Sequence, residues 1–118
     1  MSPQSVAERY FAAWQNHDTE QLQPLLAPEV SVTGPLGQID GTTSYQRSFA
    51  NIYALTRELV IVKQWIDGPD VITWFELHTH QGDVLPAVNW LHVADNDTIT
   101  RVQVAFDPRP ILGDMGQR

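Results

Sequence analysis

The run VITWFELHTHQGDVLPAVNWLHVADNDTITRVQVAF, residues 71–106, decides the fold of this chain. Three segments of this run are rich in β-branched and aromatic residues, which is typical of strands: 71–80, 84–94 and 98–106. Gln81-Gly82-Asp83 and Asp95-Asn96-Asp97 separate these segments and are typical of turns. Strands joined by short turns pair with their neighbours along the chain, so the run predicts an antiparallel meander.

Further strands are predicted upstream of the meander. Residues 59–66 are rich in β-branched side chains, and the Asp67-Gly68-Pro69-Asp70 turn connects them to the next strand. A short strand is predicted over 30–33, followed by a turn at Gly34-Pro35-Leu36-Gly37.

The N-terminal half predicts three helices. Ser2 before Pro3 is typical of a helix start, because serine caps the first turn and proline fits the first helical position. Asp18 with Gln21 resembles a capping box and predicts a short second helix that Pro28 ends. Each helix has an apolar stripe at helical spacing: Val6, Ala7, Tyr10, Phe11 and Trp14 in the first, Leu22, Leu25 and Leu26 in the second, and Tyr45, Phe49, Ile52 and Tyr53 in the third. Asp40 is predicted to cap the third helix.

Helices followed by a meander predict an α+β fold in which three N-terminal helices cover one face of a curved, mixed but mostly antiparallel sheet. We expect residues 1–118 to form a single domain, given the length of the chain. The strands are apolar on both faces, and we therefore expect a second copy of the chain to cover the other face. The outward residues of this homodimer are predicted to be Phe75, Leu77, Val88 and Trp90.

Composition narrows the possible partners. The net charge is −7 without a basic cluster, which argues against nucleic acid and anionic membranes. The chain has no cysteine, which excludes disulfides and thiolate metal sites. The N-terminus lacks the pattern of a signal peptide and no apolar run is long enough to span a membrane, so we expect a cytoplasmic protein.

Several stretches resemble the ketosteroid isomerase and SnoaL-like branch of the nuclear transport factor two-like cone fold. The matching stretches are Arg9-Tyr10-Phe11-Ala12-Ala13-Trp14 with Asp18, Leu25-Leu26-Ala27-Pro28-Glu29-Val30, Gly34-Pro35-Leu36-Gly37, Gly41-Thr42 before Phe49-Ala50-Asn51, and 99–106. This resemblance implies an enclosed pocket with an oxygen-binding end. It places Tyr10 at the family's catalytic tyrosine, Asn89 at its protonated aspartic acid and Gly34 at its base. Because glycine has no side chain, steroid isomerisation by the family's mechanism is not expected.

The resemblance also implies a register for the strands. It turns Trp74, Glu76 and His78 inward, and a slip of one residue would turn them outward. It also turns inward Ala87, Asn89, Leu91, Val102, Val104 and Phe106, while Arg101 and Gln103 face outward with His92. The expected ligand-binding wall consists of Trp14, Phe49, Tyr53, Trp74, Leu91, Val102, Val104 and Phe106.

Glu76 and His78 are the candidate proton-transfer groups, since a carboxylate beside an imidazole in an apolar cavity makes a general base. Tyr10 and Asn89 would then donate hydrogen bonds to a carbonyl oxygen. The alternative is that Glu76 and His78 form a self-satisfied polar pair. His78 and His80 have the spacing of a metal-ligand pair, but no further ligand cluster supports a metal site.

Two functions remain open at this level. The first is an acid–base enzyme, of isomerase, cyclase or dehydratase type, that acts on a hydrophobic carbonyl compound without cofactor or metal. The second is a non-catalytic ligand-binding or dimerisation module on the same fold, which the glycine at the base position favours. Epoxide hydrolysis is a weaker option, because no Asp–Arg–Asp set is predicted inside the cavity.

Overall fold

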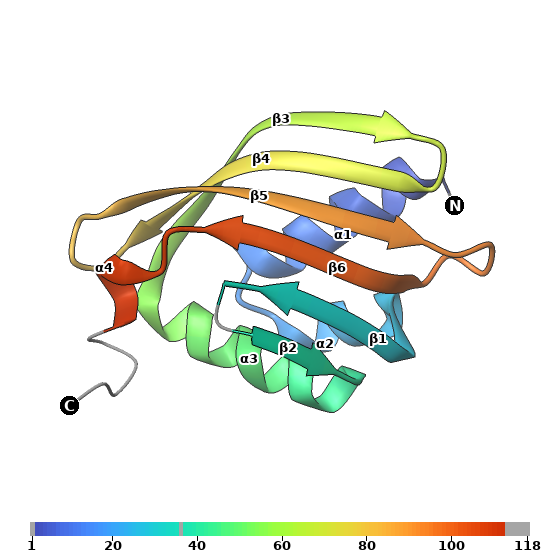
Figure 1. The fold of residues 1–118 in the computed structure, drawn as a ribbon, viewed down its shortest axis with the longest axis horizontal. Helices are drawn as coiled ribbons and strands as arrows, with labels where there is room; N and C mark the ends of the chain where they lie inside the picture. Colours follow the sequence, from blue (N-terminus) through green and yellow to red (C-terminus); the bar gives the residue numbers. More distant parts are fainter. Residues whose placement is uncertain (1, 36, 113–118) are drawn as a thin grey trace.

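Six strands form one curved sheet in the computed structural model, which describes residues 2–35 and 37–112. In chain order they are β1 (Leu26–Gly34), β2 (Gly37–Asp40), β3 (Thr56–Asp67), β4 (Asp70–Thr79), β5 (Val84–Val93) and β6 (Ile99–Phe106). The spatial order is β2-β1-β6-β5-β4-β3, and only the β1–β6 pair is parallel. The predicted meander is therefore confirmed as β4, β5 and β6 (Figure 1).

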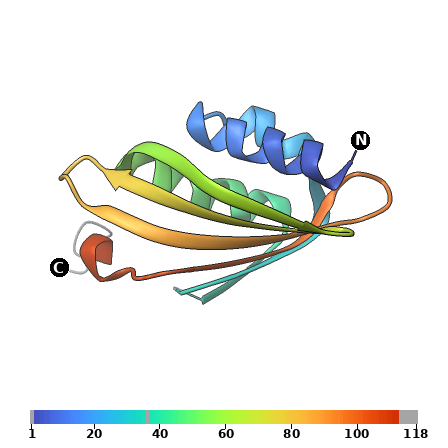
Figure 2. The ribbon, with the colours of Figure 1, turned by 90° about the horizontal axis from the view of Figure 1, so that it is seen from above.

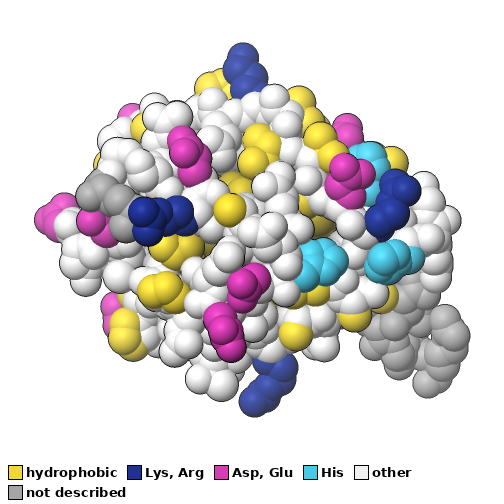
Figure 3. Space-filling view, turned by 180° about the vertical axis from the view of Figure 1, so that it is seen from behind, with side chains coloured by type: hydrophobic (Ala, Val, Ile, Leu, Met, Phe, Trp, Pro, Cys, Tyr) yellow, Lys and Arg dark blue, Asp and Glu magenta, His cyan; other side chains and the backbone are white. Residues whose placement is uncertain are grey.

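The helices are α1 (Pro3–Gln15), α2 (Thr19–Leu22), the 3-10 helix η1 (Gln23–Leu25), α3 (Thr42–Leu55) and α4 (Arg109–Leu112). Figure 2 shows α1 and α3 on the same side of the sheet, which curves around them. We call the sheet face toward α1 and α3 the inner face and the opposite one the outer face. Figure 3 views the molecule from the helical side, where charged side chains of both signs lie among scattered apolar ones. The α+β class is thus as predicted.

Two of the predicted helix caps are present. The Ser2 hydroxyl accepts a hydrogen bond from the Ser5 N–H at 3.1 Å, and Asp18 accepts from the N–H groups of Glu20 and Gln21. The predicted Asp40 cap is wrong. Gly41 occupies the N-cap of α3 with φ +92°, a conformation that favours glycine, and Asp40 belongs to β2 instead.

Some boundaries differ from those predicted. The strand expected over 30–33 begins at Leu26, and Pro28 lies within it rather than ending a helix. The β1–β6 pairing is irregular between Leu26 and Ser31, so a proline without an N–H is tolerated there. Strand β2 and helix α4 were not predicted from the sequence. Of the predicted turn at 34–37, Leu36 lies outside the described residues.

The largest correction concerns which side of β4 faces the helices. Phe75 and Leu77 are 2% and 3% exposed and point inward, whereas Trp74 is 44% exposed. The predicted register of β4 is therefore wrong by one residue, and Glu76 and His78 accompany Trp74 on the outer face. Both faces of this strand are apolar, so the pattern in the sequence does not distinguish the alternatives.

The registers of β5 and β6 are as predicted. Ala87, Asn89 and Leu91 are buried on the inner face, and Val102 is fully buried beside Leu91. Arg101 and Gln103 lie outward opposite His92 and Trp90. Since Trp74 pairs with Val88 on the outer face, His92 shares that face with Glu76 and His78 rather than opposing them.

Candidate functional site

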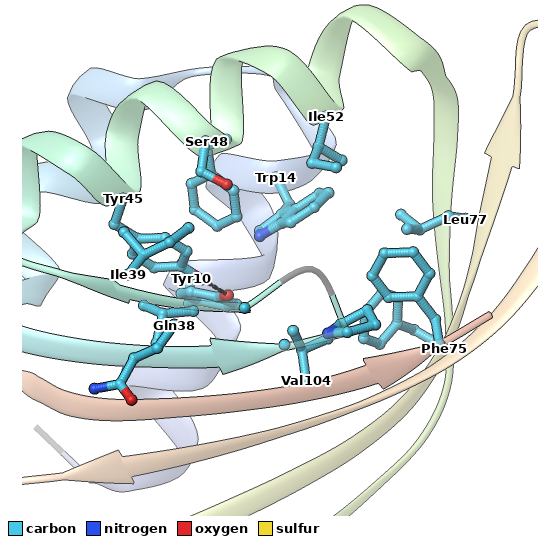
Figure 4. A pocket seen from close by; sticks show the side chains of 16 residues that line it. Tyr10, Trp14, Gln38, Ile39, Tyr45, Ser48, Ile52, Phe75, Leu77 and Val104 are labelled. Carbon is cyan, nitrogen blue, oxygen red and sulfur yellow. Dashed lines mark hydrogen bonds between the residues drawn. The ribbon is translucent and has the colours of Figure 1, made fainter. Parts of the chain in front are cut away.

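A cavity of about 130 Å³ lies between α1, α3 and the inner face of the sheet (Figure 4). It is almost entirely apolar, and its polar side chains are the hydroxyls of Tyr10, Tyr45 and Ser48, the Trp14 indole and the Gln38 amide. Its other lining residues are Val32, Gly34, Pro35, Gly37, Ile39, Phe49, Ile52, Phe75, Leu77, Val104 and Phe106. An apolar cavity of about 150 Å³ accommodates benzene, so this one suits a molecule with a single ring.

Two tyrosines bring their hydroxyl groups together at the cavity wall. Tyr10 belongs to the buried stripe of α1, and Tyr45 lies in the first turn of α3 on the face that packs against α1. Their hydroxyls form a hydrogen bond with each other. The Asn89 side-chain Nδ2 donates to the Tyr10 hydroxyl at 3.3 Å from β5. Three elements far apart in the chain thus form one polar cluster inside an apolar space.

Burial keeps the tyrosine pair protonated. Desolvation raises the pKa of Tyr10, although the neighbouring polar groups of Tyr45, Trp14 and Asn89 act in the opposite direction. The pKa of Tyr45 is raised further, because burial is reinforced by the neighbouring Tyr10. Both groups are therefore neutral hydrogen-bonding groups at physiological pH, and the pair keeps one hydroxyl hydrogen that its mutual hydrogen bond does not use.

Three buried polar atoms near this cluster have no hydrogen-bond partner within the described structure. They are the Trp14 Nε1, the Asn89 Oδ1 and the Thr73 hydroxyl. Buried polar groups without partners are uncommon in proteins, and a ligand or ordered water accounts for many of them. Trp14 lines the cavity itself, so its indole N–H is available there to an acceptor.

Aromatic rings hold the cavity wall in place. The centre of the Phe49 ring lies 4.5 Å from the ring centres of both Trp14 and Tyr45. The Phe49 ring is edge-on to Trp14 and tilted relative to Tyr45. Phe11 packs against Tyr10 on one side and against Phe75 of β4 on the other. Such contacts restrict the rotamers of the tyrosines and the tryptophan, so the hydrogen-bonding groups are positioned before a ligand arrives.

The structure places the predicted site residues in three groups. Tyr10, Trp14, Phe49, Val104 and Phe106 line the cavity. Asn89 lies behind Tyr10 and reaches the cavity only through it. The remaining wall residues do not line it: Leu91 and Val102 are core residues, Tyr53 donates to the Ala13 carbonyl, and Trp74 faces outward.

Glu76 and His78 do form a pair, with 3.2 Å between His78 Nε2 and Glu76 Oε1. However, both lie on the outer face, and neither lines the cavity. The structure therefore does not bring them near Tyr10 and Asn89, and their predicted position as a base inside the cavity is wrong. None of the described residues that line the cavity is an Asp, Glu, His, Lys or Arg.

Gly34 lies at the cavity, at the position that the family resemblance implied for a base. A Cβ added there would lie 3.1 Å from the Val104 Cγ1, closer than an ordinary contact. A longer side chain at this position would therefore need Val104 to shift. The apolar Val104 side chain occupies this part of the wall.

Tyr45, Ser48 and Gln38 were missed as site residues in the sequence. Tyr45 was identified only as part of an apolar helical stripe, and its hydroxyl gave no separate signal. Its position one turn before Phe49, on the stripe that faces α1, is the one feature that pointed inward. Gln38 lies on β2, which was not predicted as a strand at all.

A second polar cluster lies on the outer face. The Asp70 carboxylate accepts hydrogen bonds from Trp90 Nε1 and His92 Nδ1, each at 2.8 Å. These two contacts, the one from Trp90 first, hold the pKa of Asp70 below its usual value. The Arg101 guanidinium lies 5.1 Å from the centre of the Trp90 ring. The cluster is separated from the cavity by the sheet.

Within 2–35 and 37–112, no three His, Cys, Asp or Glu side chains gather closely enough to hold a metal ion. No helix in the described part of the chain is long and apolar enough to cross a membrane.

Comparison with known proteins places this geometry in a family. The model of the SnoaL-like domain matches residues 7–102. An NTF2-like protein of unknown function from Cytophaga hutchinsonii shares 21% identity with a TM-score of 0.83, covering 94% of this chain and 95% of that one. A steroid delta-isomerase from Pseudomonas aeruginosa shares 16% identity with a TM-score of 0.81, covering 98% and 86%. At these identities the structures share the fold alone. No curated protein matches the chain.

Proposed function

The chain belongs to the SnoaL-like domain family, and from this premise we propose that its cavity binds a small, neutral, largely apolar molecule through one hydrogen-bonding group. The observation that carries this proposal is the Tyr10–Tyr45 hydroxyl pair in the wall of an otherwise apolar cavity. Ligand sites generally combine an apolar lining with a few positioned polar groups. A ketone fits this arrangement, because its carbonyl oxygen accepts hydrogen bonds.

We favour binding over acid–base catalysis because no carboxylate or imidazole is found among the described residues that line the cavity. Proton abstraction next to a carbonyl needs a group with a pKa near the working pH within hydrogen-bond reach. The described lining residues include tyrosines with raised pKa values but no carboxylate or imidazole. The oxygen-binding half of an acid–base site is therefore present without its proton acceptor.

Binding can be tested with cyclopentanone and cyclopentane, which share a ring size and differ in the carbonyl group. We expect the ketone to bind about two- to tenfold more tightly in NMR titrations, the net contribution of one neutral hydrogen bond. Tyr45→Phe should abolish this preference. Tyr53→Phe should retain it, since the Tyr53 hydroxyl donates to the Ala13 carbonyl and does not line the cavity.

Two results would contradict the proposal. Equal affinity of the wild-type protein for both compounds would remove the hydroxyl pair as a ligand group. Conversion of a β,γ-unsaturated cyclic ketone to its conjugated isomer, followed by ultraviolet absorbance, would favour the acid–base enzyme instead.

We further propose that a second copy of the chain covers the outer face. A band of exposed apolar side chains crosses that face at Trp65, Trp74 and Trp90, with Ile72 and Val88 between them. The shallow groove beside this band is lined by Thr33, Gly34, Pro35, Ile72, Val88, Trp90, Gln103, Val104, Ala105 and Phe106. Sheets pack face to face through such surfaces. Phe75 and Leu77, predicted for this interface, point inward, whereas Val88 and Trp90 remain in it.

Charge supports self-association at this band and not elsewhere. The chain has a net charge of −7, so two copies repel each other over most of their surfaces. At the edges of the band, Asp70 is paired with His92 and Glu76 with His78. These carboxylates are hydrogen-bonded within each copy, which leaves the apolar band free to meet its equivalent.

A further inference from the structure

Asn89, Tyr10 and Tyr45 form a single hydrogen-bonded chain that ends at the cavity. The Asn89 Nδ2 donates to the Tyr10 hydroxyl, and the Tyr10 and Tyr45 hydroxyls bond to each other. Tyr10 and Tyr45 line the cavity and Asn89 does not. Tyr10 is bonded to both Asn89 and Tyr45, whereas Tyr45 is bonded only to Tyr10, so Tyr45 has more hydrogen-bonding capacity left for a ligand.

When the hydrogen bonds point from Asn89 toward Tyr45, the hydrogen-bonded chain presents a donor to the ligand. Each hydroxyl donates one hydrogen bond and accepts up to two. When the Asn89 amide donates to Tyr10, Tyr10 donates to Tyr45. The hydrogen of the Tyr45 hydroxyl is then available to an acceptor such as a carbonyl oxygen.

When the hydrogen bonds point from Tyr45 toward Asn89, the hydrogen-bonded chain presents an acceptor to the ligand. The two ends of the Asn89 amide have nearly the same shape, and half a turn about its last torsion exchanges Nδ2 and Oδ1. Tyr10 then donates to Asn89 Oδ1, and Tyr45 donates to Tyr10. The Tyr45 hydrogen is then used within the hydrogen-bonded chain, and both lone pairs of its oxygen, instead of one, are available to a ligand O–H or N–H.

The surroundings of Asn89 suit both orientations. Its Oδ1 is buried without a partner, and directly across the sheet Thr73 of β4 has a buried hydroxyl that also lacks one. Neither orientation of the amide therefore displaces a hydrogen bond that its Oδ1 already makes. The Trp14 indole acts on the Tyr10 oxygen, which has a free acceptor position in either case.

We infer that the hydrogen bonds of the Asn89–Tyr10–Tyr45 chain can point in either direction, so that the cavity binds ligands that donate hydrogen bonds as well as ligands that accept them. The ligand class then includes a small cyclic ketone and the corresponding alcohol, or a ring bearing an N–H group. This inference rests on the proposed function, because it concerns the same cavity. A fixed charge in the wall would impose one direction, and none is found among the described lining residues.

Three five-membered rings test the inference: cyclopentanone accepts only, pyrrole donates its N–H only, and cyclopentane does neither. We expect the wild-type protein to bind both cyclopentanone and pyrrole about two- to tenfold more tightly than cyclopentane. Tyr45→Phe should abolish both preferences. Tyr53→Phe is the matched control and should retain both, because the Tyr53 hydroxyl donates to the Ala13 carbonyl and does not line the cavity.

Asn89→Leu separates the two directions. In the direction that accepts from a ligand such as pyrrole, Tyr10 donates to the amide, so its hydrogen loses its partner in this variant. In the direction that donates to a ligand such as cyclopentanone, only the hydrogen bond from the amide to the Tyr10 oxygen is lost. Pyrrole should therefore lose more affinity than cyclopentanone. If this variant does not fold, the NMR signals of the Asn89 side-chain NH2 in the wild-type protein should differ between the two complexes, since the NH2 donates to Tyr10 in one and no longer does so in the other.

The possible outcomes are distinct. If cyclopentanone binds more tightly than cyclopentane but pyrrole does not, the inference is overturned and the proposed function stands. If neither binds more tightly than cyclopentane, the proposed function fails. If the preference for pyrrole disappears in Ser48→Ala and survives in Tyr45→Phe, Ser48 is the donor's partner and the reversible chain is refuted.

Discussion

Tyr45 is the residue on which the chemistry of the cavity depends most. It is buried, it meets Tyr10, and it has the hydrogen-bonding capacity that a ligand can use. Burial raises the pKa of all three tyrosines of the chain, Tyr10, Tyr45 and Tyr53, because a phenolate would lose its hydration. The same burial makes the folded state sensitive to alkaline pH.

The sign of this sensitivity follows from proton linkage. Above the ordinary tyrosine pKa of 10.0 the unfolded chain loses its phenol protons while the folded protein keeps them. The free energy of unfolding should therefore fall above pH 10, by about 1.4 kcal/mol per pH unit for each such tyrosine. In denaturant titrations, Tyr45→Phe should reduce this slope and Ser48→Ala should not. Identical slopes for Tyr45→Phe and the wild type would show that Tyr45 ionises freely in the folded state.

Strand β4 is the element in which sequence pattern and structure differ. Its side chains alternate as predicted, but the alternation is shifted by one residue relative to the helices. Apolar residues occupy both faces of this strand, so hydrophobicity alone leaves its orientation undetermined. The packing of Phe75 against Phe11 of α1 shows which face is inward.

Alanine substitutions on β4 check this orientation. Phe75→Ala should lower the free energy of unfolding by about 3–5 kcal/mol, because it leaves a void in the core. Trp74→Ala should lower it by less than about 1 kcal/mol, since that side chain is largely exposed in a single copy. Denaturant titrations at concentrations that favour monomers would measure both. A larger loss for Trp74→Ala than for Phe75→Ala would restore the register first predicted.

At the scale of the whole molecule, the two faces of the sheet differ in what covers them. The inner face packs against α1 and α3, while no element among the described residues covers the outer face (Figures 1 and 2). Three exposed tryptophans lie on that outer face. The proposed second copy would bury these tryptophans against their equivalents.

Light scattering tests this dimer directly. At micromolar concentrations we expect a mass about twice the 13.3 kDa of one chain. Val88→Asp should give monomers, because it places an uncompensated charge in the middle of the apolar band. Val62→Asp is the matched control on β3 and should remain dimeric, as Val62 is exposed but does not line the groove. A monomeric wild-type protein would refute the interface.

The sequence by itself determined the local features of this protein. The caps at Ser2 and Asp18, the stripe of α1 and the meander follow from interactions between residues near one another in the chain. The family resemblance extended this to the fold and to the positions of Tyr10 and Gly34 in the cavity wall.

Only the tertiary structure decided which side of β4 faces the helices, that β1 pairs in parallel with β6, and that Tyr45 meets Tyr10. The physical reason is common to all three. Each depends on contacts between segments that are distant in sequence. A strand that is apolar on both faces, or a tyrosine within an apolar stripe, is compatible with more than one set of such contacts. The position of Glu76 and His78 outside the cavity follows from the same cause.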